Sequence, residues 1–158
     1  MKRITRLANK NDVDGIYEIE AANFDFPWSK NAIENSIIND DLQDIVITEF
    51  DGILVGYISY MIVFNEIHIA NVAVRSEYRG QKISLDLFDF LTKKADEEKL
   101  KVTLEVAVKN KIAINLSPSS PAIVMSWYFL SSSLNFSKEK ISSSNKTFGS
   151  SSFFIIEA

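Results

Sequence analysis

Hydrophobic and polar residues along this chain follow two periods, and the change from one period to the other marks the predicted elements. Apolar residues that recur at every second position predict strands, and those that recur every three or four positions predict amphipathic helices. Two helical stretches begin at cap-type residues, Asn11 and Ser29, which accept hydrogen bonds from the first helical N–H groups. Strands are predicted near residues 4–7, 44–50, 53–63, 66–75 and 101–108, and helices near 11–22, 29–38 and 85–95.

The order of these elements indicates a mixed α/β (α+β) fold. Asp51 and Gly52 form a predicted hairpin turn between the second and third strands, and a hairpin makes its two strands antiparallel. The strand, helix and strand over 66–108 are long enough for a crossover that makes two strands parallel. We therefore expect one sheet that contains both kinds of neighbour.

The composition changes at Ser117. Residues 1–116 contain five serines and residues 117–158 contain fourteen, and residues 117–121 read Ser-Pro-Ser-Ser-Pro, a pattern typical of a linker. Two interpretations stay open for the remainder: an unstructured tail, or a diverged unit in which residues 151–157 form a closing strand. We predict one domain over 1–158, with an insertion or linker at 117–129 and a C-terminal unit at 130–158.

Bulk composition narrows the class of protein. The chain has 158 residues, 46% of them hydrophobic, and a net charge of −4 with a pI of about 5.1. It has the size of one domain and lacks the basic surplus of a general nucleic-acid-binding protein. It has no cysteine and one histidine, His68, so we expect no metal site. No apolar run is long enough to span a membrane and the first residues do not form a signal peptide, which predicts a cytoplasmic protein.

The most informative stretch is the apolar strand, basic turn and helix over residues 71–84. A helix N-terminus and the backbone N–H groups of such a turn face one spot, which suits an anion. The turn does not match the phosphate-loop pattern or the three glycines of a dinucleotide fingerprint. Its sequence is Arg79-Gly80-Gln81-Lys82-Ile83-Ser84.

This turn resembles the acetyl-CoA pyrophosphate turn of the GNAT N-acetyltransferases, whose pattern is Arg/Gln-x-x-Gly-x-Gly/Ala. Other segments are similar to one branch of that family, the ribosomal-protein-alanine (RimI-like) N-terminal acetyltransferases. The resemblance implies a GNAT fold with helices on both faces of a mixed central sheet, and acetyl-CoA as co-substrate. The similar segments are Phe26-Pro27-Trp28-Ser29, the block over 66–81 and the block from Leu104-Glu105-Val106 to Leu116, with weaker similarity over 130–158.

The resemblance also implies which residues bind acetyl-CoA. The backbone of the central strand would contact the pantetheine arm as a further strand would, the turn over 79–84 would receive the pyrophosphate, and a residue beyond the next strand would hold the arm. The residues concerned are Val72, Ala73 and Val74 on the strand, Arg79, Gly80, Gln81, Lys82, Ile83 and Ser84 in the turn, and Asn110.

Acetyl transfer to an amine also requires a base, and the resemblance places Glu105 in that role, directly or through a water molecule. The alternative for Glu105 is a solvent-facing position on its strand. The resemblance places Trp28, His68 and Asn71 on the acceptor side. For Trp28 the alternative is packing, and for His68 it is a structural hydrogen bond.

Two features depart from the family pattern. Both pattern glycines are replaced, by Lys82 and Ser84; Lys82 either obstructs the approach of the backbone to a phosphate or contacts the phosphate through its ammonium group. The tyrosine that acts as the family's general acid is replaced by a serine, Ser117 or Ser131 depending on the alignment, and a serine hydroxyl is a poor acid. Tyr128, one helical turn before Ser131, is a candidate substitute, and a core aromatic is its alternative role.

The resemblance therefore implies an enzyme that transfers an acetyl group to a protein N-terminal α-amine, with a ribosomal protein as the implied partner. The departures leave a second interpretation open, in which the chain is a catalytically impaired GNAT-fold domain that binds an acyl-CoA or a peptide. The oligomeric state is not predicted.

Overall fold

The computed structural model describes residues 2–39, 42–107, 123–128 and 154–156 of the chain. Its elements agree with the predicted order as far as residue 107, with ends that differ by a few residues. They are β1 (Arg3–Leu7), the 3-10 turn η1 (Lys10–Asp12), α1 (Val13–Asn23), α2 (Lys30–Ile38), β2 (Gln43–Phe50), β3 (Ile53–Val63), β4 (Glu66–Val74), the 3-10 turn η2 (Ser76–Tyr78), α3 (Ile83–Glu98), β5 (Lys101–Ala107), β6 (Ile123–Tyr128) and β7 (Phe154–Ile156).

The strands form one mixed sheet, as predicted. Its order is β1-β2-β3-β4-β5-β6, and β7 pairs with β4 outside that path. The pairs β1–β2, β2–β3 and β3–β4 are antiparallel, whereas the pairs β4–β5, β5–β6 and β4–β7 are parallel. The change from antiparallel to parallel pairing at β4 follows from the connections, because hairpins join β2 to β3 and β3 to β4, whereas α3 crosses over between β4 and β5.

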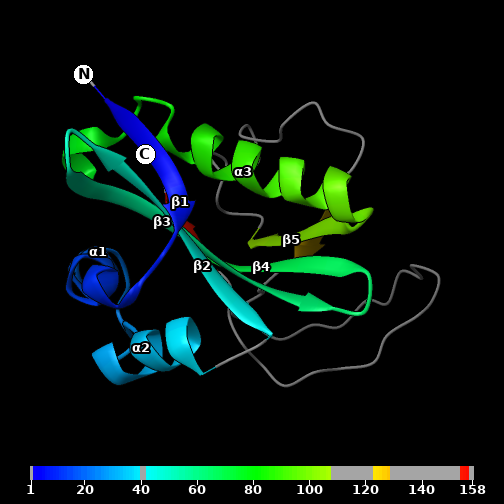
Figure 1. The fold of residues 1–158 in the computed structure, drawn as a ribbon, viewed down its shortest axis with the longest axis horizontal. Coiled ribbons are helices and arrows are strands. Elements are labelled where there is room, and N and C mark those ends of the chain that lie inside the picture. The colour runs from blue at the N-terminus through cyan, green and yellow to red at the C-terminus, as the bar shows by residue number, and fades with distance from the viewer. Residues whose placement is uncertain (1, 40–41, 108–122, 129–153, 157–158) are drawn as a thin grey trace, which may run out of the picture.

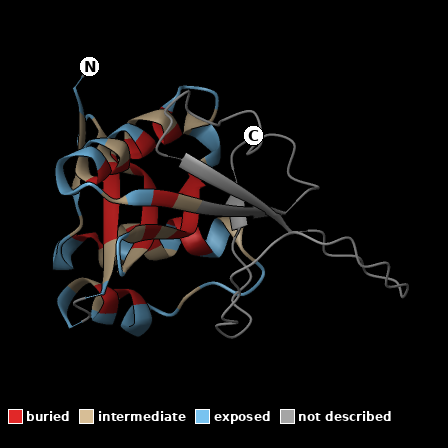
Figure 2. Cartoon of the chain, turned by 90° about the vertical axis from the view of Figure 1, so that its right-hand side faces the viewer, coloured by how far each residue is buried: buried red, intermediate tan, exposed pale blue. Residues whose placement is uncertain are grey.

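Helices cover both faces of the sheet (Figure 1), which confirms the expected arrangement. One hydrophobic cluster fills the space between the sheet and α3, and a second fills the space between the sheet and the pair α1 and α2. Figure 2 shows the buried strands between helices whose outer surfaces are exposed. The first cluster includes Ile58, Val72, Leu87 and Leu91, and the second includes Ile16, Ile19, Ile33, Tyr57 and Ala73.

An irregularity in β4 decides which side chains face which helix. Ser59 of β3 pairs with Asn71 and Tyr60 pairs with Ile69, so Ala70 is an extra residue on β4. An extra residue of this kind reverses the faces of every side chain that follows it, because side chains alternate along a strand. Ile69 and Val72 consequently share the α3 face, while Asn71 is turned to the face that α1 covers.

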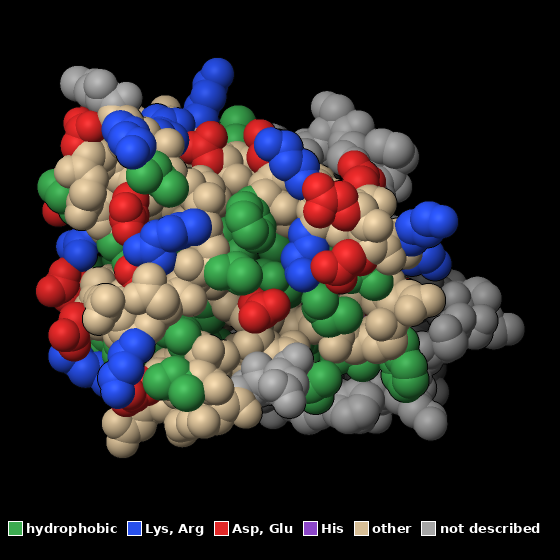
Figure 3. Space-filling model, viewed as in Figure 1, with side chains coloured by type: hydrophobic (Ala, Val, Ile, Leu, Met, Phe, Trp, Pro, Cys, Tyr) green, Lys and Arg blue, Asp and Glu red, His purple; other side chains and the backbone are tan. Residues whose placement is uncertain are grey.

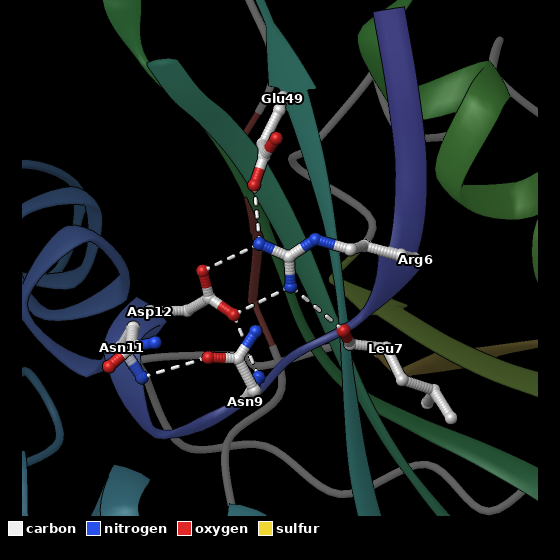
Figure 4. Close-up of polar contacts among 6 residues, drawn as sticks. All are labelled: Arg6, Leu7, Asn9, Asn11, Asp12 and Glu49. Atoms are coloured by element: carbon white, nitrogen blue, oxygen red, sulfur yellow. Dashed lines mark hydrogen bonds and ion pairs between the residues drawn. The ribbon is translucent and has the colours of Figure 1, made fainter. Parts of the chain in front are cut away.

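The beginning of α1 is attached to the sheet by a charged cluster (Figure 4). Arg6 of β1 donates two hydrogen bonds to the Asp12 carboxylate, at 2.7 and 2.9 Å, and pairs with Glu49 of β2. Asp12 also accepts the backbone N–H of Asn9 at 2.7 Å, and Asn9 accepts that of Asn11 at 2.9 Å. These bonds close a capping box over the first turn, where unpaired N–H groups need acceptors.

The structure adds a strand inside one predicted segment and bears on two more. Residues 123–128, within the segment at 117–129 that the sequence analysis assigned to an insertion or linker, form β6, parallel to β5. The β-branched and aromatic residues of this segment favour a strand, and the serine-rich surroundings concealed that signal. Residues 154–156 form β7 within the predicted closing strand at 151–157. The remainder of the predicted linker, and the C-terminal unit apart from β7, lie outside the described residues.

Candidate active site

The turn that leads into α3 has the backbone form that the sequence analysis associated with an anion site. Gly80 has a φ of 72° and Lys82, at the N-cap of α3, has a φ of 63°. Within the part of the chain that the structure describes, a Cβ at Gly80 would meet nothing within 4 Å, which leaves room for a ligand beside the turn. Ile83 and Ser84 are fully buried in the first turn of the helix.

The two basic residues of this turn differ in their surroundings. Lys82 is exposed, whereas the Nη2 atom of Arg79 donates to Oδ1 of Asn23 at 2.5 Å. Asn23 is the last residue of α1 and also donates to the carbonyl of Ile19 at 2.7 Å, so Arg79 connects the turn to the C-terminal end of α1. The Nε atom of Arg79 is buried and has no hydrogen-bond partner among the described residues.

Gln81 also contacts the protein itself. Its backbone oxygen accepts a hydrogen bond from Arg3 at 3.2 Å, and its side chain donates to the carbonyl of Glu77 at 3.3 Å. Arg3 is paired with Asp86 at 2.8 Å, which joins β1 to the first turns of α3. The geometry of the turn and its charge therefore fit an anionic group that approaches the exposed backbone of Gly80 and Lys82.

Strand β4 parts from β5 in its middle. The pairing of these strands begins at Glu66 and Lys101 and ends at Ile69 and Leu104. Beyond that point β7 pairs with β4, from Asn71 to Ala73. The backbone edge predicted to contact the pantetheine arm therefore coincides with the β4–β7 ladder at Val72 and Ala73, whereas Val74 lies beyond the ladder.

Glu105 is the first residue of β5 after its pairing with β4 has ended, and it is opposite Ser126 of β6. This register position places the backbone of the predicted base where the two strands separate. Tyr128 is the last residue of β6, opposite Ala107. The helical placement that supported Tyr128 as a substitute acid is therefore wrong. Asn110, Ser117 and Ser131 lie outside the described residues.

The three predicted acceptor residues occupy the face that α1 and α2 cover. Trp28 lies in the connection between these helices and packs against the cluster of Ile16, Ile19 and Ile33. His68 is opposite Met61, and Asn71 is opposite Ser59, which puts both on this face because of the extra residue at Ala70. His68 is half-exposed and its Nε2 lies 3.6 Å from Oε2 of Glu66, so its contact is with its own strand.

The structure adds a residue that the sequence analysis did not assign to the site. Glu20 of α1 is 1% exposed, and its carboxylate accepts hydrogen bonds from the hydroxyl of Tyr57, from Nδ2 of Asn71 at 2.9 Å and from the backbone N–H of Trp28 at 3.2 Å. The signal in the sequence is an acid that follows Ile16 by four residues, on the apolar stripe of α1. A charge there predicts either a distorted helix or a buried set of donors, and the structure contains the donors.

Comparison with known proteins agrees with this geometry. Residues 13–117 match the model of the Acetyltransferase (GNAT) family. The chain belongs to the GNAT acetyltransferase family. This acetyltransferase is 36% identical, over 118 residues, to a Bacillus subtilis (strain 168) protein described as a candidate alanine N-acetyltransferase of ribosomal protein bS18. The aligned part covers 73% of this chain and 77% of that protein.

Solved structures share its fold. The ribosomal-protein-S18-alanine N-acetyltransferase from Escherichia coli superposes with a TM-score of 0.66 at 22% identity, over 73% of this chain and 74% of that chain. The PaiA N-acetyltransferase from Thermoplasma acidophilum, solved in complex with coenzyme A, superposes with a TM-score of 0.65 at 18% identity, over 73% and 86%. The predicted enzyme class and family are confirmed, and acetyl-CoA is the acetyl donor.

The described residues also bear on other classes of protein. They contain no group of three or more His, Cys, Asp or Glu side chains placed to hold a metal ion. No helix formed by them is long and apolar enough to cross a membrane. Figure 3 shows acidic and basic side chains mixed across one face of the enzyme, with apolar side chains exposed near its centre.

Proposed function

We propose that this acetyltransferase modifies the N-terminal α-amine of a protein, and that a ribosomal protein is its substrate in the cell. The observation that carries the proposal is the position of Glu105 at the point where β5 leaves β4, level with the extra residue Ala70. The relative that is 36% identical and acts, by its description, on a ribosomal protein supports the choice of acceptor. Such a substrate would place the enzyme in the cytoplasm.

The reaction requires mainly proton transfer and the positioning of its two substrates. An α-amine has a pKa near 8, so an appreciable fraction is neutral at pH 7 and the base removes one proton as the nitrogen attacks the thioester carbonyl. The acetyl–sulfur bond breaks as the new amide forms, and the thiolate that leaves takes up a proton. Glu105 is proposed as the acceptor of the amine proton, directly or through one water molecule.

The donor and the acceptor would approach from different sides of the strand pair. The turn of Gly80 and Lys82 at the N-terminus of α3 is proposed to bind the pyrophosphate of acetyl-CoA, which suits the helix dipole. Trp28, His68 and Asn71, on the face of α1 and α2, are proposed to line the approach of the acceptor peptide. In this arrangement the amine meets the thioester beside the separation of β4 and β5.

A second function remains in competition, because β7 pairs with the β4 edge that the donor would use and Lys82 replaces a pattern glycine. In this alternative the chain is a catalytically impaired GNAT-fold domain that retains only binding. Tyr128, the candidate substitute for the acid, lies on strand β6 and not on the helix from which its role was argued.

A turnover assay with a peptide panel separates the two functions. The full chain is incubated with acetyl-CoA and with peptides that differ in their first residue, among them one that begins with alanine, and release of the free thiol is measured. Matched peptides with a blocked N-terminus are the control. Turnover that requires a free α-amine supports the enzyme, whereas acetyl-CoA binding in calorimetry without turnover on any peptide supports the impaired domain.

A further inference from the structure

Glu20 is a buried acid for which acetyl transfer has no direct use. Only 1% of Glu20 is exposed, so its carboxylate does not contact a peptide or acetyl-CoA that binds from solvent. A buried carboxylate is costly unless hydrogen bonds satisfy it, and this one accepts three. Two of them, from Tyr57 and Asn71, meet at Oε1, and the third, from the N–H of Trp28, ends at Oε2.

The three donors belong to three separate segments, and two of these segments carry proposed acceptor residues. Tyr57 is on β3, Asn71 is on β4 directly after the extra residue Ala70, and Trp28 is in the connection between α1 and α2. Ser59, the neighbour of Asn71 across the ladder, accepts the Asn71 backbone N–H at 3.1 Å. Both the backbone and the side chain of Asn71 are therefore fixed.

The donors that reach Glu20 are neutral. Burial, together with the nearby Glu20 charge, raises the pKa of the Tyr57 hydroxyl well above its ordinary value, so Tyr57 keeps its proton and acts as a donor throughout the useful pH range. The three neutral donors all have a partner only while the Glu20 side chain offers two acceptor oxygens. Loss of one oxygen leaves a buried N–H or O–H without a partner.

We propose that Glu20 is a positioning residue, whose carboxylate fixes the α1–α2 connection at Trp28 against β4 at Asn71 and so sets the geometry of the acceptor approach. This inference rests on the proposed function, because it assigns a role to Glu20 in binding a peptide acceptor. It also explains why an acid occupies the apolar stripe of α1, where an uncharged residue would pack more easily. Glu20 acts through Asn71 and Trp28 and does not itself touch the substrate.

Replacement of one hydroxyl tests the inference with little change in packing. Tyr57→Phe removes a donor to Glu20. The matched control is Tyr60→Phe, on the same strand and equally buried, which removes a hydroxyl that donates to Asp44 at 3.0 Å on the opposite face. We expect Tyr57→Phe to raise the KM for the acceptor peptide, with the KM for acetyl-CoA unchanged. Tyr60→Phe should change neither constant.

Glu20→Gln is the stronger variant, because an amide cannot accept from all three donors in either orientation. We expect kcat/KM for the acceptor peptide to fall about 10- to 100-fold, as for other small misplacements of a binding group, again with the KM for acetyl-CoA unchanged. Glu18→Gln is its control, since Glu18 lies on the same helix, is exposed and pairs only with Arg75 among the described residues, at 2.6 Å. If Glu20→Gln does not fold, the pair of tyrosine variants decides the question.

The outcomes separate this inference from the proposed function. Turnover by the parent, together with a selective loss of peptide affinity in Tyr57→Phe, supports both. Turnover by the parent with equal constants in Tyr57→Phe and Tyr60→Phe, or with parallel loss for both substrates, overturns the role of Glu20 alone. A parent that turns over no peptide overturns the proposed function, and the inference that rests on it is overturned as well.

Discussion

Asp12 and Glu20 are two buried acids on one continuous helical segment, and the protein holds them in opposite ways. Asp12, at the start of α1, is bound by the guanidinium of Arg6, and the side chains are 9% and 32% exposed. Glu20, near the end of α1, is bound by neutral donors and is 1% exposed. The ion pair of Arg6 and Asp12 fastens the start of the helical segment to β1, and neither side chain is among the proposed site residues.

The difference indicates what each acid is for. At Asp12, burial opposes ionisation, but the hydrogen bonds from Arg6 and from the Asn9 backbone and the charge of Arg6 outweigh it, so the pKa of Asp12 lies below its ordinary value. Its contribution is to stability. Glu20 has no such cation among its described donors, and its bonds lead to residues on the acceptor side. We therefore expect the first acid to affect unfolding and the second to affect peptide binding.

The largest effect on activity should come from substitution of a third acid, Glu105, whose proposed role is proton transfer and neither stability nor the positioning of the peptide. Glu105→Gln keeps the size of the side chain and removes its basicity. A positioned general base contributes roughly 10²- to 10⁴-fold, so kcat/KM should fall by about that amount, while acetyl-CoA affinity and the melting temperature remain those of the parent. The loss should shrink as the pH rises, because more of the α-amine is then already neutral.

The steady-state constants of Glu105→Gln across a pH series provide the measurement. A variant that retains the parent rate at neutral pH would show that Glu105 is not the base. His68 would then be the next candidate, because histidine has an ordinary pKa near 6.5 and His68 shares the acceptor face.

Asp12→Asn tests whether the ion pair of Arg6 and Asp12 stabilises the fold. It removes the charge that Arg6 pairs with but leaves a side chain of the same size. A hydrogen bond to a charged group contributes about 1.5–3 kcal/mol, so the free energy of unfolding at pH 7 should fall by roughly that amount in urea denaturation. Steady-state constants for both substrates should not change.

The pH dependence of this loss follows from the direction of the pKa shift. The pKa of Asp12 is lower in the folded protein than in the unfolded chain, so its stabilisation is complete above the ordinary aspartate pKa, about 3.9. That stabilisation disappears as the pH falls through the folded value. The parent and Asp12→Asn should therefore converge in unfolding free energy below about pH 4. A difference that is constant from pH 7 to pH 3 would contradict the ion-pair explanation.

Lys82→Gly should have a smaller effect, at the donor side of the site. The left-handed backbone at Lys82 is one that glycine adopts without strain, and the absence of a Cβ lets N–H groups approach a phosphate more closely. One additional hydrogen bond of about 0.5–1.5 kcal/mol corresponds to roughly 2- to 10-fold tighter acetyl-CoA binding in calorimetry. Lys82→Ala removes the charge and retains the Cβ, so equal behaviour of the two variants would exclude the steric explanation.

Ile155→Pro should have the smallest effect. Ile155 of β7 is opposite Val72 of β4, and proline is excluded from the interior of a ladder. Weaker β7 pairing should free the β4 edge for the donor and tighten acetyl-CoA binding by about two- to threefold, the equivalent of part of one hydrogen bond. Ile155→Val keeps the N–H and is the control. Weaker binding in the proline variant would show that β7 supports the donor site.

The sequence predicted the elements through residue 107 because their signals are local. The hydrophobic period shows that β4 is a strand and α3 a helix, and the side chain of Ser29 accepts the N–H of Ala32 at 3.2 Å, as its cap position suggested. The motifs quoted from the sequence also predicted the family and acetyl-CoA as the acetyl donor. Strand β6 was missed because the prolines and serines before it are typical of a linker.

The tertiary structure alone decided the faces and the contacts. The extra residue at Ala70 cannot be inferred from a period of two, since it depends on how β3 and β4 pair, and it is what turns Asn71 towards Glu20. Arg79 was expected at a phosphate, and the structure places its guanidinium on Asn23, because the end of α1 lies beside the turn only in the folded chain. The sequence by itself identified the acetyltransferase family and predicted an anion site at the turn over residues 79–84. The sequence does not show which residues bind Glu20, because the donors come from three distant segments. Only the packing of α1 against the sheet brings those donors to one carboxylate.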